Sequence, residues 1–286
     1  MTVAGLFYTP ERHLRAPWRI VLFLVVTLGA LLVATTVEGM VVGVAAAAGF
    51  RLLLSEWSIP VGYLLAHAVM LRSVERKGWD YVGLHAPAAR PSVLGYGAVL
   101  GTLAIAVPSL ILLSIGQLRS VPAADGSWWV ASGLSFANLL PAAFGEELLL
   151  RGYIFSVLRE AIGWRFTLIS TSIVFGLLHV PNPGSDGQSI VLVMLAGFFL
   201  GSILLATKSL YAATAAHFAW NWFMAAALHS PVSGLPVISP DYRVIDAGPD
   251  WLTGGQWGPE GGLGAALGMF CILIYLHARP LRRMES

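Results

Sequence analysis

The chain has 286 residues, of which 57% are hydrophobic and only 11% are charged, and its mean hydropathy is +0.75. Soluble globular domains carry about 25% charged residues, so this composition is typical of an integral membrane protein. A net charge of +2 without a long basic patch argues against nucleic-acid binding. The single cysteine, Cys271, excludes an intrachain disulfide and a cysteine-rich metal site.

Eight apolar stretches approach the ~20 residues that a helix needs to cross a bilayer. The first is preceded by arginines and is longer than the core of a signal peptide, so we expect a retained signal anchor. An Ala-rich continuation over residues 41–50 would lengthen or tilt that helix. We therefore predict an all-α membrane protein, a polytopic bundle of about eight transmembrane helices, forming a single integral membrane domain over residues 1–286. The stretches lie at about 18–37, 59–71, 93–115, 128–150, 166–180, 189–207, 210–228 and 263–277.

The distribution of basic residues predicts the orientation of this bundle. If the N-terminus is cytoplasmic, 14 of the 17 Lys and Arg residues fall in inside segments, which the positive-inside rule favours. We therefore expect a multi-pass protein of a bacterial plasma membrane with both termini cytoplasmic. The inside residues are Arg12, Arg15, Arg19, Arg72, Arg76, Lys77, Arg90, Arg151, Arg159, Arg165, Lys208, Arg279, Arg282 and Arg283; the outside residues are Arg51, Arg119 and Arg243.

The longest segment without a strong apolar run is 229–262, which this orientation places outside the membrane. It is rich in Gly, Pro and Trp and contains several acidic residues. It could cover a cavity or bind a partner. The favoured interpretation is a structured extracytoplasmic loop with Trp251 and Trp257 at the membrane interface.

Three ionisable residues lie at the end of the fourth apolar stretch, where each costs roughly 2.5–3.5 kcal/mol at membrane depth and is a functional candidate. On a helix, Glu147 and Arg151 are four residues apart and form a structural ion pair in the favoured orientation. Glu146 points about 100° away and has no partner within a turn, so we expect a distant partner for it. Pro141 and Gly145 predict a kinked or opened helix at this position.

Two later apolar stretches contain the polar side chains that could meet Glu146. His179 lies near the end of the fifth stretch, one turn after Phe175, and His217 and Asn221 share one helical face in the seventh. Each alone has an ordinary structural explanation, such as a core histidine or an interhelical hydrogen bond. Four groups on three helices form one site only if the bundle brings those helices together. No role is assigned to three other histidines: His67, His229 and His277.

Two chemistries use such a set of groups. A carboxylate and a neutral imidazole can activate a shared water by general-base catalysis, while a second imidazole and an amide donate hydrogen bonds to an oxyanion. Alternatively, Glu146, His179 and His217 could bind a catalytic Zn²⁺ with water as the fourth ligand. Both hydrolyse a carbonyl bond within the membrane. The chain contains neither a His-Glu-x-x-His zincin segment nor a Gly-x-Ser-x-Gly elbow.

Three motifs in order, Glu146-Glu147-x-x-x-Arg151, Phe175-x-x-x-His179 and His217-x-x-x-Asn221, resemble those of the CPBP family. This is the CAAX-protease and bacteriocin-processing (Abi) family of intramembrane proteases, which includes the type II CAAX prenyl endopeptidases. The motif-bearing core extends over about residues 128–228.

The resemblance implies a role for each matching residue. Glu146 and His179 would activate the attacking water, His217 and Asn221 would form the oxyanion site, and Glu147 and Arg151 would support the first motif. The family is often labelled metalloprotease, and a metal-free glutamate mechanism has been argued for it. We favour the metal-free mechanism, without a cofactor, because Asn221 then acts as a hydrogen-bond donor.

The expected function is intramembrane endopeptidase activity on a membrane-bound or lipidated substrate, for which a prenylated CAAX-type peptide is the family precedent. The expected partners are that peptide or protein and the membrane lipids, with no nucleic acid. Two alternatives come from other classes. A non-catalytic scaffold or immunity-type protein could share the fold, and a proton-coupled transporter also needs intramembrane Glu and His, although we find no internal repeat.

Overall fold

The computed structural model describes residues 3–10, 13–50 and 56–278, and the chain is 76% helical. This confirms the predicted all-α fold class. Three helices are followed by single π-helical turns: η1 (Leu71–Glu75), η4 (Leu148–Tyr153) and η5 (Met224–Leu228). The α-helices are α1 (Val3–Phe7), α2 (Ala16–Ala47), α3 (Ser58–Met70), α4 (Pro91–Ser114), α5 (Trp128–Glu147), α6 (Ile154–Leu178), α7 (Gly187–Thr207), α8 (Leu210–Phe223), α9 (Asp250–Thr253) and α10 (Leu263–Ala278).

Each of the eight apolar stretches falls in a helix, and the Ala-rich continuation lengthens α2 to 32 residues, as expected. Among the described residues, four helical segments are long and apolar enough to cross a membrane: Ala16–Ala47, Pro91–Ser114, Trp128–Leu178 and Gly187–Thr207. The number of transmembrane helices, about eight, therefore stays a prediction. The basic residues Arg12, Arg51, Arg279, Arg282 and Arg283, which contribute to the predicted orientation, lie outside the described residues.

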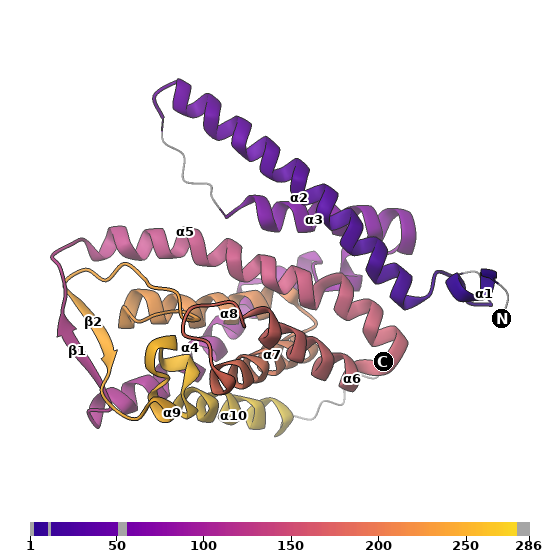
Figure 1. Ribbon diagram of the computed structural model, residues 1–286. Coiled ribbons are helices and arrows are strands. Elements are labelled where there is room, and N and C mark those ends of the chain that lie inside the picture. The colour runs from indigo at the N-terminus through magenta and orange to yellow at the C-terminus, as the bar shows by residue number, and fades with distance from the viewer. Residues whose placement is uncertain (1–2, 11–12, 51–55, 279–286) are drawn as a thin grey trace.

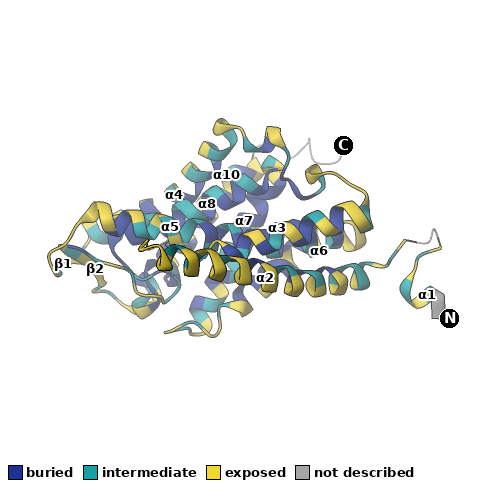
Figure 2. Cartoon of the chain, turned by 90° about the horizontal axis from the view of Figure 1, so that it is seen from above, coloured by how far each residue is buried: buried dark blue, intermediate teal, exposed yellow. Residues whose placement is uncertain are grey.

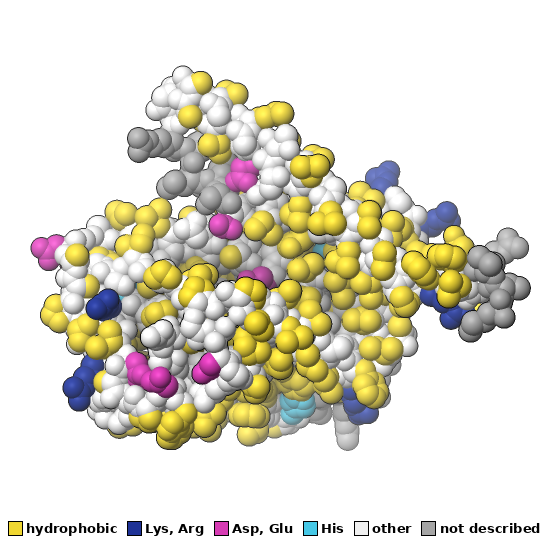
Figure 3. Space-filling model, viewed as in Figure 1, with side chains coloured by type: hydrophobic (Ala, Val, Ile, Leu, Met, Phe, Trp, Pro, Cys, Tyr) yellow, Lys and Arg dark blue, Asp and Glu magenta, His cyan; other side chains and the backbone are white. Residues whose placement is uncertain are grey.

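The helices form a bundle whose surface is largely apolar. In Figure 1, α2 and α3 lie together above the other helices, and the far end of α2 projects away from them. Figure 2 shows the buried residues concentrated in the middle of the bundle, in α7 and α8 among others. In Figure 3, hydrophobic side chains cover the middle of the visible face, and the Lys and Arg side chains lie at its two ends. A membrane protein needs an apolar surface of this kind because its middle faces lipid.

A close helix contact in the core joins α4 to α8. A Cβ atom added to Gly101 of α4 would lie 2.0 Å from the carbonyl oxygen of Ala216 in α8, so only glycine allows the two backbones to approach this closely. Ala216 directly precedes His217. The α4–α8 contact therefore sets the position of one predicted site residue.

The helical segment that contains the first motif runs from Trp128 to Leu178 and bends twice. The predicted opening near Pro141 is absent from α5, which stays helical through that proline. The break comes later, in the π-helical turn η4, where Gly152 leaves the helical region with φ −81° and ψ −113°. A second bend is at Gly163, with φ 77° and ψ 161°. The opened backbone therefore lies after the two glutamates and not before them.

The outer loop, residues 229–262, is an ordered structure that packs on the bundle. Its strand β2 (Tyr242–Asp246) pairs antiparallel with β1 (Leu118–Pro122), with Leu118 opposite Asp246. Trp251 is 55% exposed, as an interface residue would be, but Trp257 is only 1% exposed. The interface prediction is therefore wrong for Trp257, because that indole fills the core between the loop and the bundle.

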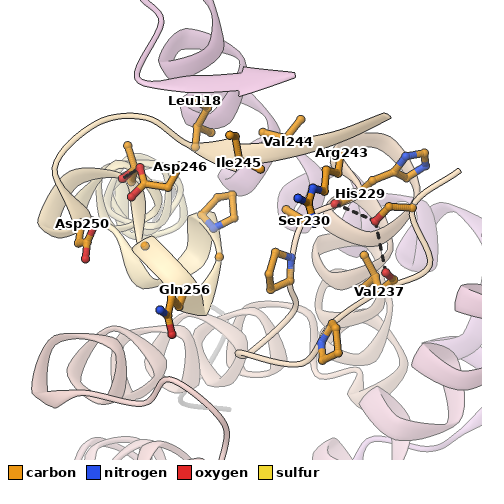
Figure 4. A pocket seen from close by; sticks show the side chains of 17 residues that line it. Leu118, His229, Ser230, Val237, Arg243, Val244, Ile245, Asp246, Asp250 and Gln256 are labelled. Atoms are coloured by element: carbon orange, nitrogen blue, oxygen red, sulfur yellow. Dashed lines mark hydrogen bonds between the residues drawn. The ribbon is translucent and has the colours of Figure 1, made fainter. Parts of the chain in front are cut away.

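A cavity of about 500 Å³ lies within this loop, next to β2 and α9 (Figure 4). Arg243, Asp246 and Asp250 line it. None of the predicted site residues does, so the candidate active site must be found elsewhere.

Candidate active site

Three helical segments place the predicted residues together. Glu146 and Glu147 end α5, His179 follows the last residue of α6, and His217 and Asn221 lie on α8. The Oε2 atom of Glu146 lies 3.9 Å from Nε2 of His179 and 4.0 Å from Nε2 of His217. The structure thus brings the unpaired glutamate next to histidines that are distant in sequence.

Glu146 has one buried and one accessible side. Its Oε2 atom is buried and has no hydrogen-bond partner among the described residues, whereas 41% of the side chain is exposed. A buried carboxylate oxygen without a donor is costly. Both histidine distances are too long for a direct hydrogen bond and fit a bridging water. Glu146 can therefore bind a small donor molecule between itself and the imidazoles.

Glu147 is fully buried, and its Oε1 atom has two partners. Nη1 of Arg151 donates to it over 2.9 Å, which is the ion pair expected from the spacing. Nδ1 of His217 also lies 3.0 Å from the same atom. The interpretation of Glu147 as a partner of Arg151 alone is therefore incomplete, because this carboxylate also orients a predicted site residue.

Arg151 connects the first motif to two other helices. Its side chain is fully buried, Nη2 donates to the carbonyl oxygen of Gly197 in α7 over 3.1 Å, and the guanidinium lies 4.2 Å from the ring centre of Phe175 in α6. A cation over an aromatic face is attracted by the ring quadrupole. Arg151 therefore holds α5, α6 and α7 in a fixed arrangement around the glutamates.

Hydrogen bonds assign the tautomers of the two histidines. Nδ1 of His179 lies 2.8 Å from the carbonyl oxygen of Phe175, which can only accept, so Nδ1 carries a proton. Nδ1 of His217 likewise donates to the Glu147 carboxylate. In the neutral imidazoles, both Nε2 atoms are then acceptors on the Glu146 side. The phenylalanine of the second motif thus orients its histidine through a backbone carbonyl.

Asn221 lies one turn beyond His217 on α8 and lines a cavity of about 30 Å³ together with His179 and His217. That volume holds about one water molecule. Within the described part of the chain, the Asn221 amide makes no hydrogen bond, so it is free to donate into the cavity.

His67, to which the sequence assigned no role, holds the backbone at the break in η4. Its Nδ1 donates to the carbonyl oxygen of Tyr63 over 2.7 Å, and its Nε2 accepts the backbone N–H of Tyr153 over 3.0 Å. A Cβ on Gly152 would lie 2.3 Å from that Nε2 atom, so the imidazole occupies the space that the glycine leaves. No sequence pattern marks His67, because it has no carboxylate nearby in the sequence and hydrogen-bonds only with the main chain among the described residues.

The Zn²⁺ alternative requires three ligands arranged around one point. Across residues 3–10, 13–50 and 56–278, no group of three or more His, Cys, Asp or Glu side chains has an arrangement that could hold a metal ion.

The fold and the site together define a helical membrane protein with a glutamate–histidine centre enclosed by three helical segments. Residues 127–223 match the family described as Type II CAAX prenyl endopeptidase Rce1-like, and all three motifs lie in this range. The match confirms the resemblance to the CPBP family and supports a CAAX-type intramembrane protease. The comparisons with curated proteins and with solved structures found no match.

Proposed function

We propose that the protein is an intramembrane endopeptidase that hydrolyses a peptide bond of a membrane-associated substrate. The observation that supports this most is the buried Oε2 atom of Glu146, which has no hydrogen-bond partner among the described residues and faces the Nε2 atoms of His179 and His217 at 3.9 and 4.0 Å. A carboxylate oxygen left unpaired in an apolar bundle is unfavourable, and its position beside two imidazoles supports a functional role for Glu146.

In this proposal, a water molecule held between Glu146 and His179 hydrolyses the peptide bond. The water donates one hydrogen to Oε2 of Glu146 and the other to Nε2 of His179. As its oxygen attacks the carbonyl carbon, Glu146 takes the proton and later gives it to the leaving amine. The low polarity around the site strengthens these hydrogen bonds.

The oxyanion is stabilised by His217 and Asn221. The Asn221 amide donates directly. His217 donates from Nε2 only as an imidazolium, and its Nδ1–H then stays bonded to the Glu147 carboxylate. Glu147 thus links the structural ion pair to the chemistry.

An apolar groove supports a lipidated substrate, with a prenylated CAAX-type peptide as the first candidate. It has a volume of about 650 Å³ and lies between α4, α5 and α8. Phe144 and Phe218 line this groove. In the sequence, Phe144 lies two residues before Glu146, and Phe218 directly follows His217. A hydrocarbon chain in this groove would bring the attached peptide close to the catalytic glutamate.

The orientation is also proposed: a multi-pass protein of the plasma membrane, with both termini cytoplasmic. The distribution of 14 of 17 basic residues supports it.

The decisive test compares Glu146→Gln with wild type in the cleavage of a farnesylated test peptide by detergent-purified protein. Loss of a general base is expected to lower the rate by about 10²–10⁴-fold with little change in stability. Glu38→Gln is the matched control, because the Glu38 Oε1 atom is also buried and has no partner in the part of the chain that the structure describes, and it lies on the long helix α2 outside the site. Equal rates for Glu146→Gln and wild type would refute the assignment.

Two further measurements separate the alternatives. A wild-type protein that cleaves neither farnesylated nor unmodified peptide would favour a scaffold or immunity-type protein. Cleavage that continues in the presence of a strong chelator would support the metal-free mechanism. If the chelator abolishes cleavage and added Zn²⁺ restores it, the metal-free mechanism is refuted.

A further inference from the structure

Glu260 places a third carboxylate at the candidate active site, although it lies outside the matched range 127–223. It belongs to a short 3₁₀ turn, Pro259–Gly261, in the outer loop. Its side chain lines the same small cavity as His179, His217 and Asn221. The outer loop therefore forms one wall of the cavity and is not only a connection between helices.

Three donors converge on the Glu260 carboxylate. The indole Nε1 of Trp220 donates to Oε2 over 2.8 Å. The backbone N–H and the hydroxyl of Ser233 both donate to Oε1, the hydroxyl over 2.9 Å. Bonds to an ionised acceptor are shorter and stronger than neutral ones, so this carboxylate is a firm attachment point.

Each oxygen leads to a different part of the candidate active site. Trp220 directly precedes Asn221 on α8, so the Oε2 contact fixes the face of the helix from which the amide projects. Through Ser233, the Oε1 contact reaches the turn after α6: Asn182 donates from Nδ2 to the Ser233 carbonyl and from its backbone N–H to the His179 carbonyl, each over 3.0 Å. One carboxylate thus joins both segments.

We propose that Glu260 is a positioning residue that holds Asn221 and His179 in register across the catalytic cavity. It acts through Trp220 on one side and through Ser233 and Asn182 on the other. This inference rests on the proposed function, because it assigns Asn221 and His179 the roles given above. It also assigns the outer loop a task, which is to keep the oxyanion side and the base side of the site at a constant separation.

The first experiment is a double-mutant cycle on peptide cleavage. Trp220→Phe removes the indole N–H together with the five-membered part of the indole, and it keeps a six-membered aromatic ring at this buried position. We expect it to lower kcat about three- to tenfold, the effect of one lost hydrogen bond, with KM nearly unchanged. In an Asn221→Ala background the same change is expected to have no further effect, because the residue being positioned is gone.

The matched control for this cycle is Trp128→Phe. Trp128 also donates from its indole, over 2.8 Å, to the carbonyl oxygen of Ala226, away from the cavity. We expect kcat to stay within twofold of wild type. Equal losses from both tryptophan changes, or a Trp220→Phe loss that persists in the Asn221→Ala background, would refute the positioning role.

The second experiment does not depend on activity. Glu260→Gln keeps the shape of the side chain but replaces one carboxylate oxygen with an NH₂ group. This NH₂ group then faces a hydrogen-bond donor of Trp220 or Ser233 and cannot accept from it. Hydrogen exchange measured by mass spectrometry is expected to rise in two separate segments, 179–184 and 217–222, while exchange in α4 stays unchanged. Unchanged exchange in both segments would refute the inference. An inactive wild type with raised exchange in Glu260→Gln would instead refute the proposed function and leave Glu260 as the link between the two segments.

Discussion

Replacing Arg151 with leucine tests whether the buried ion pair serves the fold, the chemistry or both. The guanidinium and the Glu147 carboxylate are both fully buried, and the change also removes the hydrogen bond to the Gly197 carbonyl. Removing one partner of a buried pair typically costs about 3–5 kcal/mol, because the other charge stays buried without compensation. Total stabilities are about 5–15 kcal/mol, so Arg151→Leu is expected to remove roughly a fifth or more of the free energy of unfolding.

The double variant Glu147→Leu/Arg151→Leu separates the two roles. Replacing both charges with apolar side chains of similar volume is often neutral, so its stability is expected to return close to that of wild type. However, Nδ1 of His217 then loses its carboxylate partner. We therefore expect a folded protein with strongly reduced cleavage.

The assay is denaturant unfolding in detergent, followed by tryptophan fluorescence, together with peptide cleavage by the same preparations. Arg159→Leu is the control, since Arg159 is an exposed arginine on α6 and its loss should change stability by no more than about 0.5 kcal/mol. A stable Arg151→Leu protein would contradict the structural role of the pair. A fully active double variant would contradict the role of Glu147 in orienting His217.

Three further predictions concern the elements around the site. Gly152→Ala places a Cβ 2.3 Å from the His67 ring and should destabilise the protein by about 1–3 kcal/mol in thermal unfolding; combination with His67→Ala should relieve the clash, and an additive loss would contradict it. Gly101→Ala should push α8 away from α4 and lower both stability and cleavage, whereas unchanged values would mean that the close approach is dispensable. Asp186→Ala removes the N-cap of α7 and should cost about 0.5–2 kcal/mol at pH 7. The hydrogen bond from the backbone of Ser189 lowers the pKa of Asp186, so its contribution is present above the ordinary carboxyl pKa of about 4 and is lost as the pH falls through the lower folded value. An Asp186→Ala deficit that does not shrink at low pH would contradict this account.

Local patterns in the sequence predict the helices, the ion pair in the first motif and the need of Glu146 for a distant partner. Apolar runs predict helices because, away from water, a helix satisfies the backbone hydrogen bonds of the run within the run itself. All eight runs fall in helices. The i, i+4 spacing of Glu147 and Arg151 predicts their ion pair because helical geometry alone brings these side chains together. The isolation of Glu146 predicts a distant partner, and the structure places His179 and His217 beside it.

The tertiary structure decides the contacts that depend on which helices are neighbours. Glu147 binds His217 as well as Arg151, His67 binds the main chain at Tyr153, and Glu260 reaches the cavity from the outer loop. The sequence separation is 70 residues between Glu147 and His217, 86 between His67 and Tyr153, and 40 between Glu260 and Trp220, so no local spacing predicts these contacts. The sequence by itself determined which residues can do chemistry in a membrane. Helix packing decided which of them meet, because only the assembled bundle sets the distances between side chains on separate helices.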